Sequence, residues 1–353
     1  PFMMMYLHKA PHRPWWPSPE KFAEFYEKEF PEPETLFDDY SGRGTAAKTA
    51  EMNILTHMQY MHDSKIRPET LKEMGNVQPE IKYTRGETVV RPGPDGFMRP
   101  FSRANEEQKK KYDVTLDKIN NDFKENWPTM NDKEKMKWKF QRYMQDYLGT
   151  ISSVDDNVGR VLDYLDETGL DENTIVVYTS DQGFYLGEHG WFDKRFIYDE
   201  SFKTPLMIKW PNKIKPGTTN EEMVQNLDFA QTFLEAAMID APDDMQGESL
   251  IPLLTGDTES WDRDAVYYHY YEYPSVHMAK RHYGIVNKEF KLAHFYYDVD
   301  EWELYDRLND PNEMNNVYND PIYKEVVEKL SLELKEMRIK YKDSEELDKS
   351  FIY

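Results

Sequence analysis

The 353-residue sequence contains no cysteine. This absence excludes disulfide bonds, thiolate metal sites and a cysteine nucleophile within the chain. No apolar run approaches the ~20 residues that a transmembrane helix needs, so no membrane span is predicted. Basic residues are scarce, with 44 Lys and Arg against 66 Asp and Glu and a formal net charge of −22. Nonspecific binding to nucleic acid is therefore not expected, and an anionic ligand would need a local basic pocket.

The chain opens on an apolar run, Phe2–His8, which predicts a short strand. Natural N-termini rarely begin inside a buried strand. We therefore expect the chain to be a fragment whose N-terminal strands are missing, so the lack of a visible leader is uninformative.

Hydrophobic periodicity predicts a helical region over Glu106–Gly169, followed by a continuous apolar strand at Thr174–Thr179. A helix, a short turn and a buried strand are typical of an αβ unit, so we predict an α/β fold with a mostly parallel sheet flanked by helices. Further elements are expected as helices at 19–29, near 45–61 and at 227–238, a strand at 205–210 and a turn at 92–96.

The sequence changes character from Asp264 onward, where short aromatic runs alternate with turns and precede a charged amphipathic helix at Tyr323–Met337. This pattern predicts a small antiparallel sheet with a helix against it. We place the domains at residues 1–260 and 261–353.

Chargeable side chains follow the strand at Thr174–Thr179. The carboxylate of Asp181 and the amide oxygen of Gln182 suit a hard cation such as Ca²⁺ or Mg²⁺, although a plain turn would also use them. Lys194 could hold a sulfate or phosphate oxygen, or could simply pair with Asp193 on the surface.

Three further residues are candidates with structural alternatives. His189 could be a ligand, a proton donor or a packed core imidazole. His12, followed by Arg13, lies in a proline-rich turn and could transfer a proton or bind a charged group, or could belong to a rigid surface turn. The segment 269–282, HYYEYPSVHMAKRH, suits sugar rings that bear anionic groups, but an ordinary sheet surface is equally aromatic.

Together these segments resemble the type I sulfatases of the alkaline-phosphatase-like superfamily. The matching pieces are FMMMYLHKAPHRPWWP, SDQGFYLGEHGWFDKRFIYDESFKTPLMIKWP, GESLIPLLTG and KLAHFYYDVDEWELYDRLNDPNEMNN, in the family's order. The resemblance implies a sulfuric ester hydrolase that removes sulfate from a sulfated glycan, of the amino-sugar, glycosaminoglycan or mucin type. It also implies a periplasmic or secreted location.

The resemblance implies a role for each candidate. Asp181 and Gln182 match two ligands of the active-site Ca²⁺, and Lys194 matches the lysine that holds the sulfate oxygens. His12 matches the histidine near the leaving-group oxygen. Substrate contacts are expected from three more residues: Arg13, His189 and His277.

One part of the family pattern is missing. Sulfatases use a formylglycine made from Cys or Ser in a Cys/Ser-x-Pro/Ala-x-Arg motif, and no such motif is found in this sequence. We therefore expect the chain alone to be inactive, with the formylglycine on a missing upstream segment. Two alternatives stay open: a phosphate or phosphonate ester hydrolase of the same superfamily, and a non-catalytic module that binds sulfated glycans. The sequence does not indicate an oligomeric state.

Overall fold

The computed structural model describes residues 2–75, 83–85, 88–90 and 95–352. The chain forms two compact units, each made of three segments. The first comprises residues 1–38, 51–169 and 185–193, and the second comprises residues 39–50, 170–184 and 194–353. The predicted domain boundary between residues 260 and 261 falls inside the second unit. The division into domains at that point stays a prediction.

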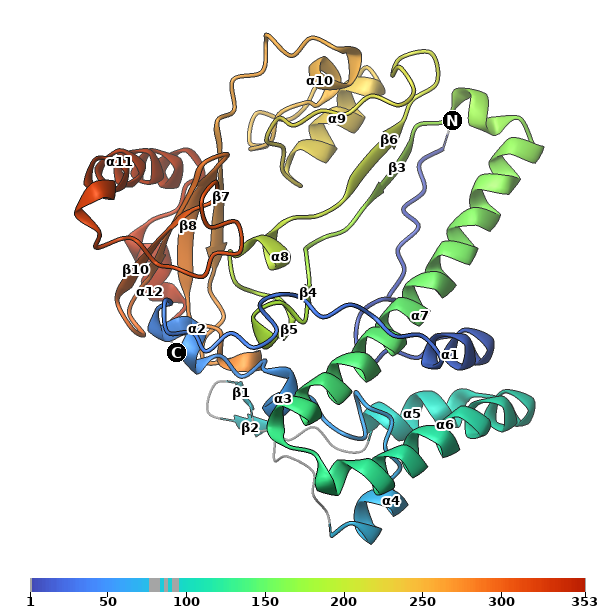
Figure 1. Ribbon diagram of the computed structural model, residues 1–353. Helices are drawn as coiled ribbons and strands as arrows, with labels where there is room; N and C mark the ends of the chain where they lie inside the picture. Colours follow the sequence, from blue (N-terminus) through green and yellow to red (C-terminus); the bar gives the residue numbers. More distant parts are fainter. Residues whose placement is uncertain (1, 76–82, 86–87, 91–94, 353) are drawn as a thin grey trace. The chain divides into compact units, whose positions relative to one another are not determined.

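The first unit is mainly helical (Figure 1). Its helices are α1 (Pro19–Tyr26), α3 (Ile54–His57), α4 (Pro68–Glu73), α5 (Asp95–Arg103), α6 (Glu106–Asn126) and α7 (Asp132–Glu167), and its strand pairs are β1 (Tyr83–Arg85) with β2 (Thr88–Val90) and β4 (Tyr185–Leu186) with β5 (Phe192–Asp193). Asn105 and Asn131 begin the two long helices with capping boxes. The predicted helical region at 106–169 is thus confirmed as two helices.

An aromatic core holds the helices of the first unit together. Helix α1 contacts both α6 and α7, and the ring of Phe22 on α1 meets that of Tyr112 on α6 at 5.6 Å. The buried residues of this cluster are Phe22, Tyr60, Ile66, Leu71, Tyr112, Leu116, Ile119, Phe123 and Trp127. Large aromatic side chains supply much of the buried apolar area here, which offsets the low aliphatic content.

The second unit contains the C-terminal sheet, whose strand order is β10-β9-β8-β7 with every pair antiparallel (Figure 1). Its strands are β7 (Ala265–Tyr270), β8 (His282–Asn287), β9 (Phe290–Phe295) and β10 (Glu301–Asp306). Leu330 and Leu334 of α11 (Lys324–Lys340) pack on apolar residues of this sheet. The predicted small antiparallel sheet with a helix against it is confirmed.

The second unit also contains the strand pair of β3 (Val176–Thr179) and β6 (Leu206–Lys209). The helices are α2 (Thr45–Thr49), α8 (Asp199–Phe202), α9 (Asp228–Ala236), α10 (Ile251–Thr255) and α12 (Glu345–Ser350). Within the described part of the chain, no helix combines the length and the apolar character needed to cross a membrane.

Several local expectations need correction. Strand β3 pairs antiparallel with β6, and all strand pairs among the described residues are antiparallel, so the parallel pairing expected for this region is not found there. The run 2–8 forms no strand in the structure, because its backbone lacks a hydrogen-bonded partner strand. The helix expected near 45–61 is two short helices, since Ala50 is extended (ψ 135°). The predicted turn at 92–96 lies largely outside the described residues.

Candidate functional site

The turn after β3 carries the two predicted metal ligands. Ser180 Oγ donates a hydrogen bond to the carbonyl of Gln182 at 2.9 Å. Asn226 Nδ2 donates to the carbonyl of Asp181 at 2.9 Å. The backbone of the turn is therefore held by side chains, while the Asp181 side chain is exposed and its carboxylate lies 3.4 Å from Ser180 Oγ.

Gly183 lets this turn pass against the chain that follows Lys194. Its N–H donates to the carbonyl of Ser201 at 2.9 Å. A Cβ at Gly183 would lie 2.2 Å from the carbonyl oxygen of Glu200 and 2.6 Å from that of Lys203. Only glycine fits so close a backbone approach, which fixes the position of the turn relative to the residue 194–204 segment.

A pocket of about 750 Å³ in the second unit brings three predicted residues together. Asp181, Gln182 and Lys194 all line it. The Lys194 amine lies 5.4 Å from the centre of the Phe184 ring. Two oxygen donors and one cation therefore face the same space, which is the combination needed to bind an anionic group with help from a hard cation.

Other residues of the pocket were not predicted as site residues. They include Arg195, Asn226, Tyr268, His269 and Tyr270. The backbone of Arg195 is fixed, because its N–H donates to Ser201 Oγ at 2.8 Å and its carbonyl accepts from the Tyr268 hydroxyl at 2.7 Å. Proximity to Lys194 could have suggested Arg195, whereas nothing around Asn226 forms a recognisable motif.

The segment 269–282 contributes less to the pocket than its composition suggested. His269 lines the pocket, but His277, Lys280, Arg281 and His282 are not among its lining residues. His277 is buried and has a positive φ of 62°. His282 is fully buried, and burial lowers its pKa to about 3 because the charged imidazolium is disfavoured there.

The two cations of this segment, Lys280 and Arg281, bind neighbouring groups of the second unit. Lys280 Nζ donates to the Tyr273 hydroxyl at 2.6 Å and lies 4.0 Å from the centre of that ring. Arg281 donates to the Asp298 carboxylate at 2.8 Å and to the Phe351 carbonyl at 2.8 Å. Arg281 is thus paired with a carboxylate of the second unit, and Lys280 is held by the hydroxyl and the ring of Tyr273.

His12 and Arg13 belong to the first unit. His12 is exposed, and its Nδ1 lies 2.7 Å from the Arg13 carbonyl oxygen. The guanidinium of Arg13 binds the buried carboxylate of Asp63, with Nε donating to Oδ1 at 2.6 Å, and lies 5.1 Å from the centre of the Phe192 ring. Burial opposes the ionised form of Asp63, but the charges of Arg13 and His62 and the hydrogen bonds from Arg13 and the Gln59 N–H together lower its pKa.

His189 also lies in the first unit and is fully buried. The ring Nδ1 of His189 is 3.1 Å from Asp38 Oδ2, and its backbone N–H donates to Thr35 Oγ1 at 3.0 Å. The rings of Tyr185 and Trp191 lie 6.3 and 5.4 Å from the imidazole. These surroundings are those of a packed core histidine, which is one of the three alternatives that the sequence left for His189.

The donors in the pocket fit a hard divalent cation. Asp181 offers a carboxylate and Gln182 an amide oxygen, which are the ligand types that Ca²⁺ and Mg²⁺ prefer. Because Ca²⁺ takes about six to eight oxygen ligands, these two side chains account for part of a coordination shell.

Comparison with known proteins points to one family. The sequence profile of the family described as "Sulfatase" matches residues 1–239, and that of "N-sulphoglucosamine sulphohydrolase, C-terminal" matches residues 187–340. An N-acetylglucosamine-6-O-sulfatase from Bacteroides thetaiotaomicron is 44% identical over all of this chain and 60% of its own length.

Solved structures show the same likeness. A structure described as a complex with its substrate D-glucosamine-2-N,6-O-disulfate matches 98% of this chain and 66% of its own, with a TM-score of 0.87 and 43% identity. A phosphonate monoester hydrolase from Silicibacter pomeroyi matches 62% of this chain and 44% of its own, with a TM-score of 0.54 and 27% identity. The chain thus spans 60% of the length of the Bacteroides sulfatase and 66% of the chain solved with the disulfated glucosamine.

Proposed function

Because the chain belongs to the sulfatase family, we propose that the protein is a sulfate ester hydrolase that acts on a sulfated amino sugar of a glycan. The observation that carries the proposal is the pocket lined jointly by Asp181, Gln182 and Lys194. Further support comes from the relatives, one named as an N-acetylglucosamine-6-O-sulfatase and one solved with a disulfated glucosamine. The protein would work in the periplasm or outside the cell, where sulfated glycans are met.

Within the pocket, each side chain has a proposed task. Asp181 and Gln182 would hold the divalent cation, for which we propose Ca²⁺, and the bound ion would supply positive charge against the sulfuryl oxygens. Lys194 would hold the same oxygens and counter the charge that develops as the S–O bond to the sugar breaks. Tyr268 and Tyr270 would present aromatic surface to the sugar ring.

The other predicted residues keep roles as proposals. By the resemblance to the family, His12 would give a proton to the departing sugar oxygen, and Arg13 and His277 would support substrate binding. The predicted substrate role of His189 has less support, because its side chain is fully buried beside Asp38. The attacking group in the family is a formylglycine, and the sequence offers neither a cysteine nor a matching serine motif for it. The attack on sulfur is therefore not assigned to a residue of this chain.

The test compares three substrates with the protein as its host produces it: a 6-sulfated amino sugar, an aryl sulfate and an aryl phosphate. We expect the sulfated amino sugar to be turned over at least 100-fold faster than the aryl phosphate. Faster phosphate turnover would favour the phosphate or phosphonate hydrolase alternative, to which the Silicibacter likeness also points. Binding of sulfated glycans without any hydrolysis would favour a non-catalytic module.

A further inference from the structure

A smaller hollow of about 210 Å³ opens beside the pocket in the second unit. It is lined by Gln225, Leu227, Gln246, Tyr267, His269, Tyr271, Tyr341, Asp343 and Leu347. Four of these residues, Gln225, Leu227, Tyr267 and His269, also line the larger pocket. The two spaces are therefore neighbours with a shared wall, and a molecule that fills the pocket can extend into the hollow.

The hollow has the apolar surface that a sugar ring needs. The rings of Tyr267 and Tyr341 stack at 5.7 Å with an interplanar angle of 13°. Leu227 and Leu347 leave 45% and 37% of their surfaces exposed at its edge. Aromatic and aliphatic faces of this kind pack against the C–H faces of sugars.

Polar groups in the hollow match sugar hydroxyls. Gln225 Nε2 donates to the Tyr341 hydroxyl at 2.9 Å, and Gln246 brings a second amide to the wall. The carboxylate of Asp343 lies 2.7 Å from His269 Nδ1 and also accepts from the Tyr267 hydroxyl. Amides, hydroxyls and a carboxylate together donate and accept the hydrogen bonds that an uncharged saccharide offers.

The two spaces differ in charge. The pocket is lined by four cations, Lys194, Arg195, Lys203 and Arg307, and by four carboxylates, Asp181, Asp199, Glu222 and Glu272, whereas the lining of the hollow contains no lysine or arginine. Asp343 adds a carboxylate there. A sulfate group therefore finds fixed cations in the pocket and none in the lining of the hollow.

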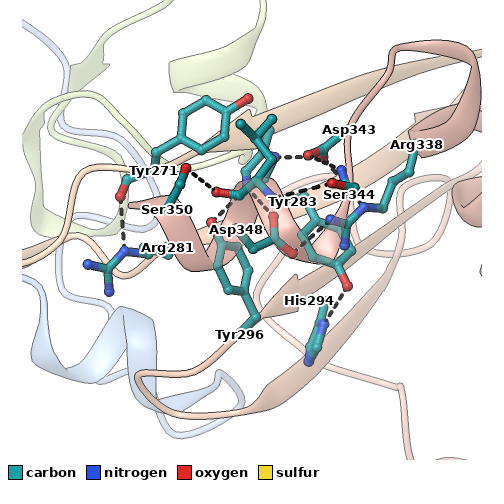
Figure 2. Close-up of polar contacts among 12 residues, drawn as sticks. Tyr271, Arg281, Tyr283, His294, Tyr296, Arg338, Asp343, Ser344, Asp348 and Ser350 are labelled. Carbon is teal, nitrogen blue, oxygen red and sulfur yellow. Dashed lines mark hydrogen bonds and ion pairs between the residues drawn. The ribbon is translucent and has the colours of Figure 1, made fainter. Parts of the chain in front are cut away.

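The wall formed by the end of the chain is fixed in place. Arg338 contacts both Asp343 and Asp348, donating to the latter at 2.7 Å (Figure 2). Ser344 Oγ caps α12 by accepting from the N–H of Leu347 at 3.2 Å. The guanidinium of Arg338 also covers the Tyr283 ring at 3.9 Å. Side chains held in this way form a prepared surface rather than one that must order on binding.

The same cluster could be considered as a metal site, because ligand atoms of His269, Asp343 and Asp348 lie within 4.8 Å of one another. The Arg338 guanidinium already supplies the positive charge there, and a second cation beside it would be repelled. The contacts are better explained as a support for the hollow.

We propose that this hollow is a second saccharide subsite, which binds an uncharged sugar attached to the sulfated sugar in the pocket. The inference rests on the proposed function, since the pocket must hold the sulfated sugar. It implies that the protein prefers a sulfated unit with a neutral neighbour over the isolated sulfated monosaccharide.

Calorimetric titration with the full protein tests this independently of turnover. The ligands are a 6-sulfated amino sugar, a disaccharide of that sugar with a neutral neighbour, and the same disaccharide with its second unit also sulfated. We expect the neutral disaccharide to bind at least ten-fold more tightly than either other ligand. Tyr341→Ala should reduce that gain to less than three-fold while leaving monosaccharide binding within two-fold.

A second variant fills the hollow instead of emptying it. Leu347→Trp should also remove the gain, whereas Leu332→Trp, at a position 66% exposed on α11 and outside the hollow, should keep it. If the monosaccharide binds but the disaccharide gains nothing, or the gain survives both hollow variants, the subsite is disproved and the proposed function stands. If no sulfated ligand binds, the proposed function fails and the subsite with it.

Discussion

The Asp228 carboxylate and the Arg263 guanidinium form a buried ion pair in the second unit, with side chains 0% and 4% exposed. Arg263 Nη2 donates to Asp228 Oδ1 at 2.8 Å. The same carboxylate accepts the N–H groups of Gln225 at 2.7 Å and Glu248 at 2.9 Å. One buried charge therefore fixes the 225–227 loop, which lines the pocket.

Replacing Asp228 with alanine would remove the buried carboxylate that binds Arg263 and leave the guanidinium with the 38% exposed Glu248 side chain at 3.3 Å. We expect a loss of about 3–5 kcal/mol in the free energy of unfolding, the usual cost of breaking such a pair from one side. Urea unfolding measures it. Asp171→Ala is the matched control, because Asp171 pairs with a Lys209 side chain that is 58% exposed, and should cost less than about 1 kcal/mol. Equal losses in the two variants would contradict this role for Asp228.

Lys194→Ala tests the proposed clamp on the sulfate. Removing one charged donor that is aimed at developing negative charge should lower kcat by a factor of about 100 or more in the full protein. Lys209→Ala is the control, since Lys209 lies on β6 outside the pocket lining. If the two variants keep similar rates, the sulfate is held by another group.

Asp181→Ala tests the proposed metal ligand. We expect Ca²⁺ affinity to fall by about ten-fold or more, since a charged oxygen ligand is lost. Calorimetric titration of the chain with CaCl₂ reports this without substrate. Asp300→Ala, at a side chain 81% exposed that pairs with His294, serves as the control. A Ca²⁺ affinity unchanged by Asp181→Ala would remove this residue from the site.

Gly183→Ala tests the close backbone approach under the metal turn. The added methyl group would collide with two carbonyl oxygens, the nearer at 2.2 Å, so the turn must move. We expect a lower melting temperature and at least a ten-fold loss of Ca²⁺ affinity. Gly159→Ala is the control, because a Cβ there meets nothing within 4 Å and alanine favours a helix by about 1 kcal/mol. Similar behaviour of both variants would show that the turn tolerates a side chain.

His282 should make the fold sensitive to acid. Burial lowers its pKa from 6.5 to about 3, so between these values the unfolded chain binds a proton that the folded chain does not. Stability therefore falls as the pH drops below 6.5, by about 2–3 kcal/mol at about pH 4.5 from this group alone. His282→Gln should flatten that slope in urea unfolding, with the difference at pH 8 as the reference. Parallel slopes for both proteins would contradict the prediction.

Much of the fold could be predicted from local patterns. The helices of 106–167 follow from their apolar periodicity and asparagine caps, and the strands of 265–306 from aromatic runs between turns. The antiparallel partner of β3 could not be predicted in this way. Pairing direction depends on which strand lies next to β3 in the sheet, and 26 residues separate the end of β3 from the start of β6.

The site shows the same contrast. The sequence identified Asp181, Gln182 and Lys194 because these polar side chains follow a predicted strand and because the surrounding segment resembles the sulfatases. Asn226 could not be identified, since its use depends on a loop that a distant buried ion pair folds toward the pocket. The resemblance to the family also did not indicate that Tyr341, near residue 353, would line a neighbouring hollow.

The division of the chain into two units has a consequence for its synthesis. The chain passes from one unit to the other after Asp38, Ala50, Gly169, Phe184 and Asp193. The first unit has all its segments once Asp193 has been made. Thr45, by contrast, belongs to the second unit, and its N–H must wait for Glu301, to which it donates at 2.7 Å. On the ribosome, therefore, residues 39–50 are made long before Glu301, which lies 256 positions after Thr45 in the chain.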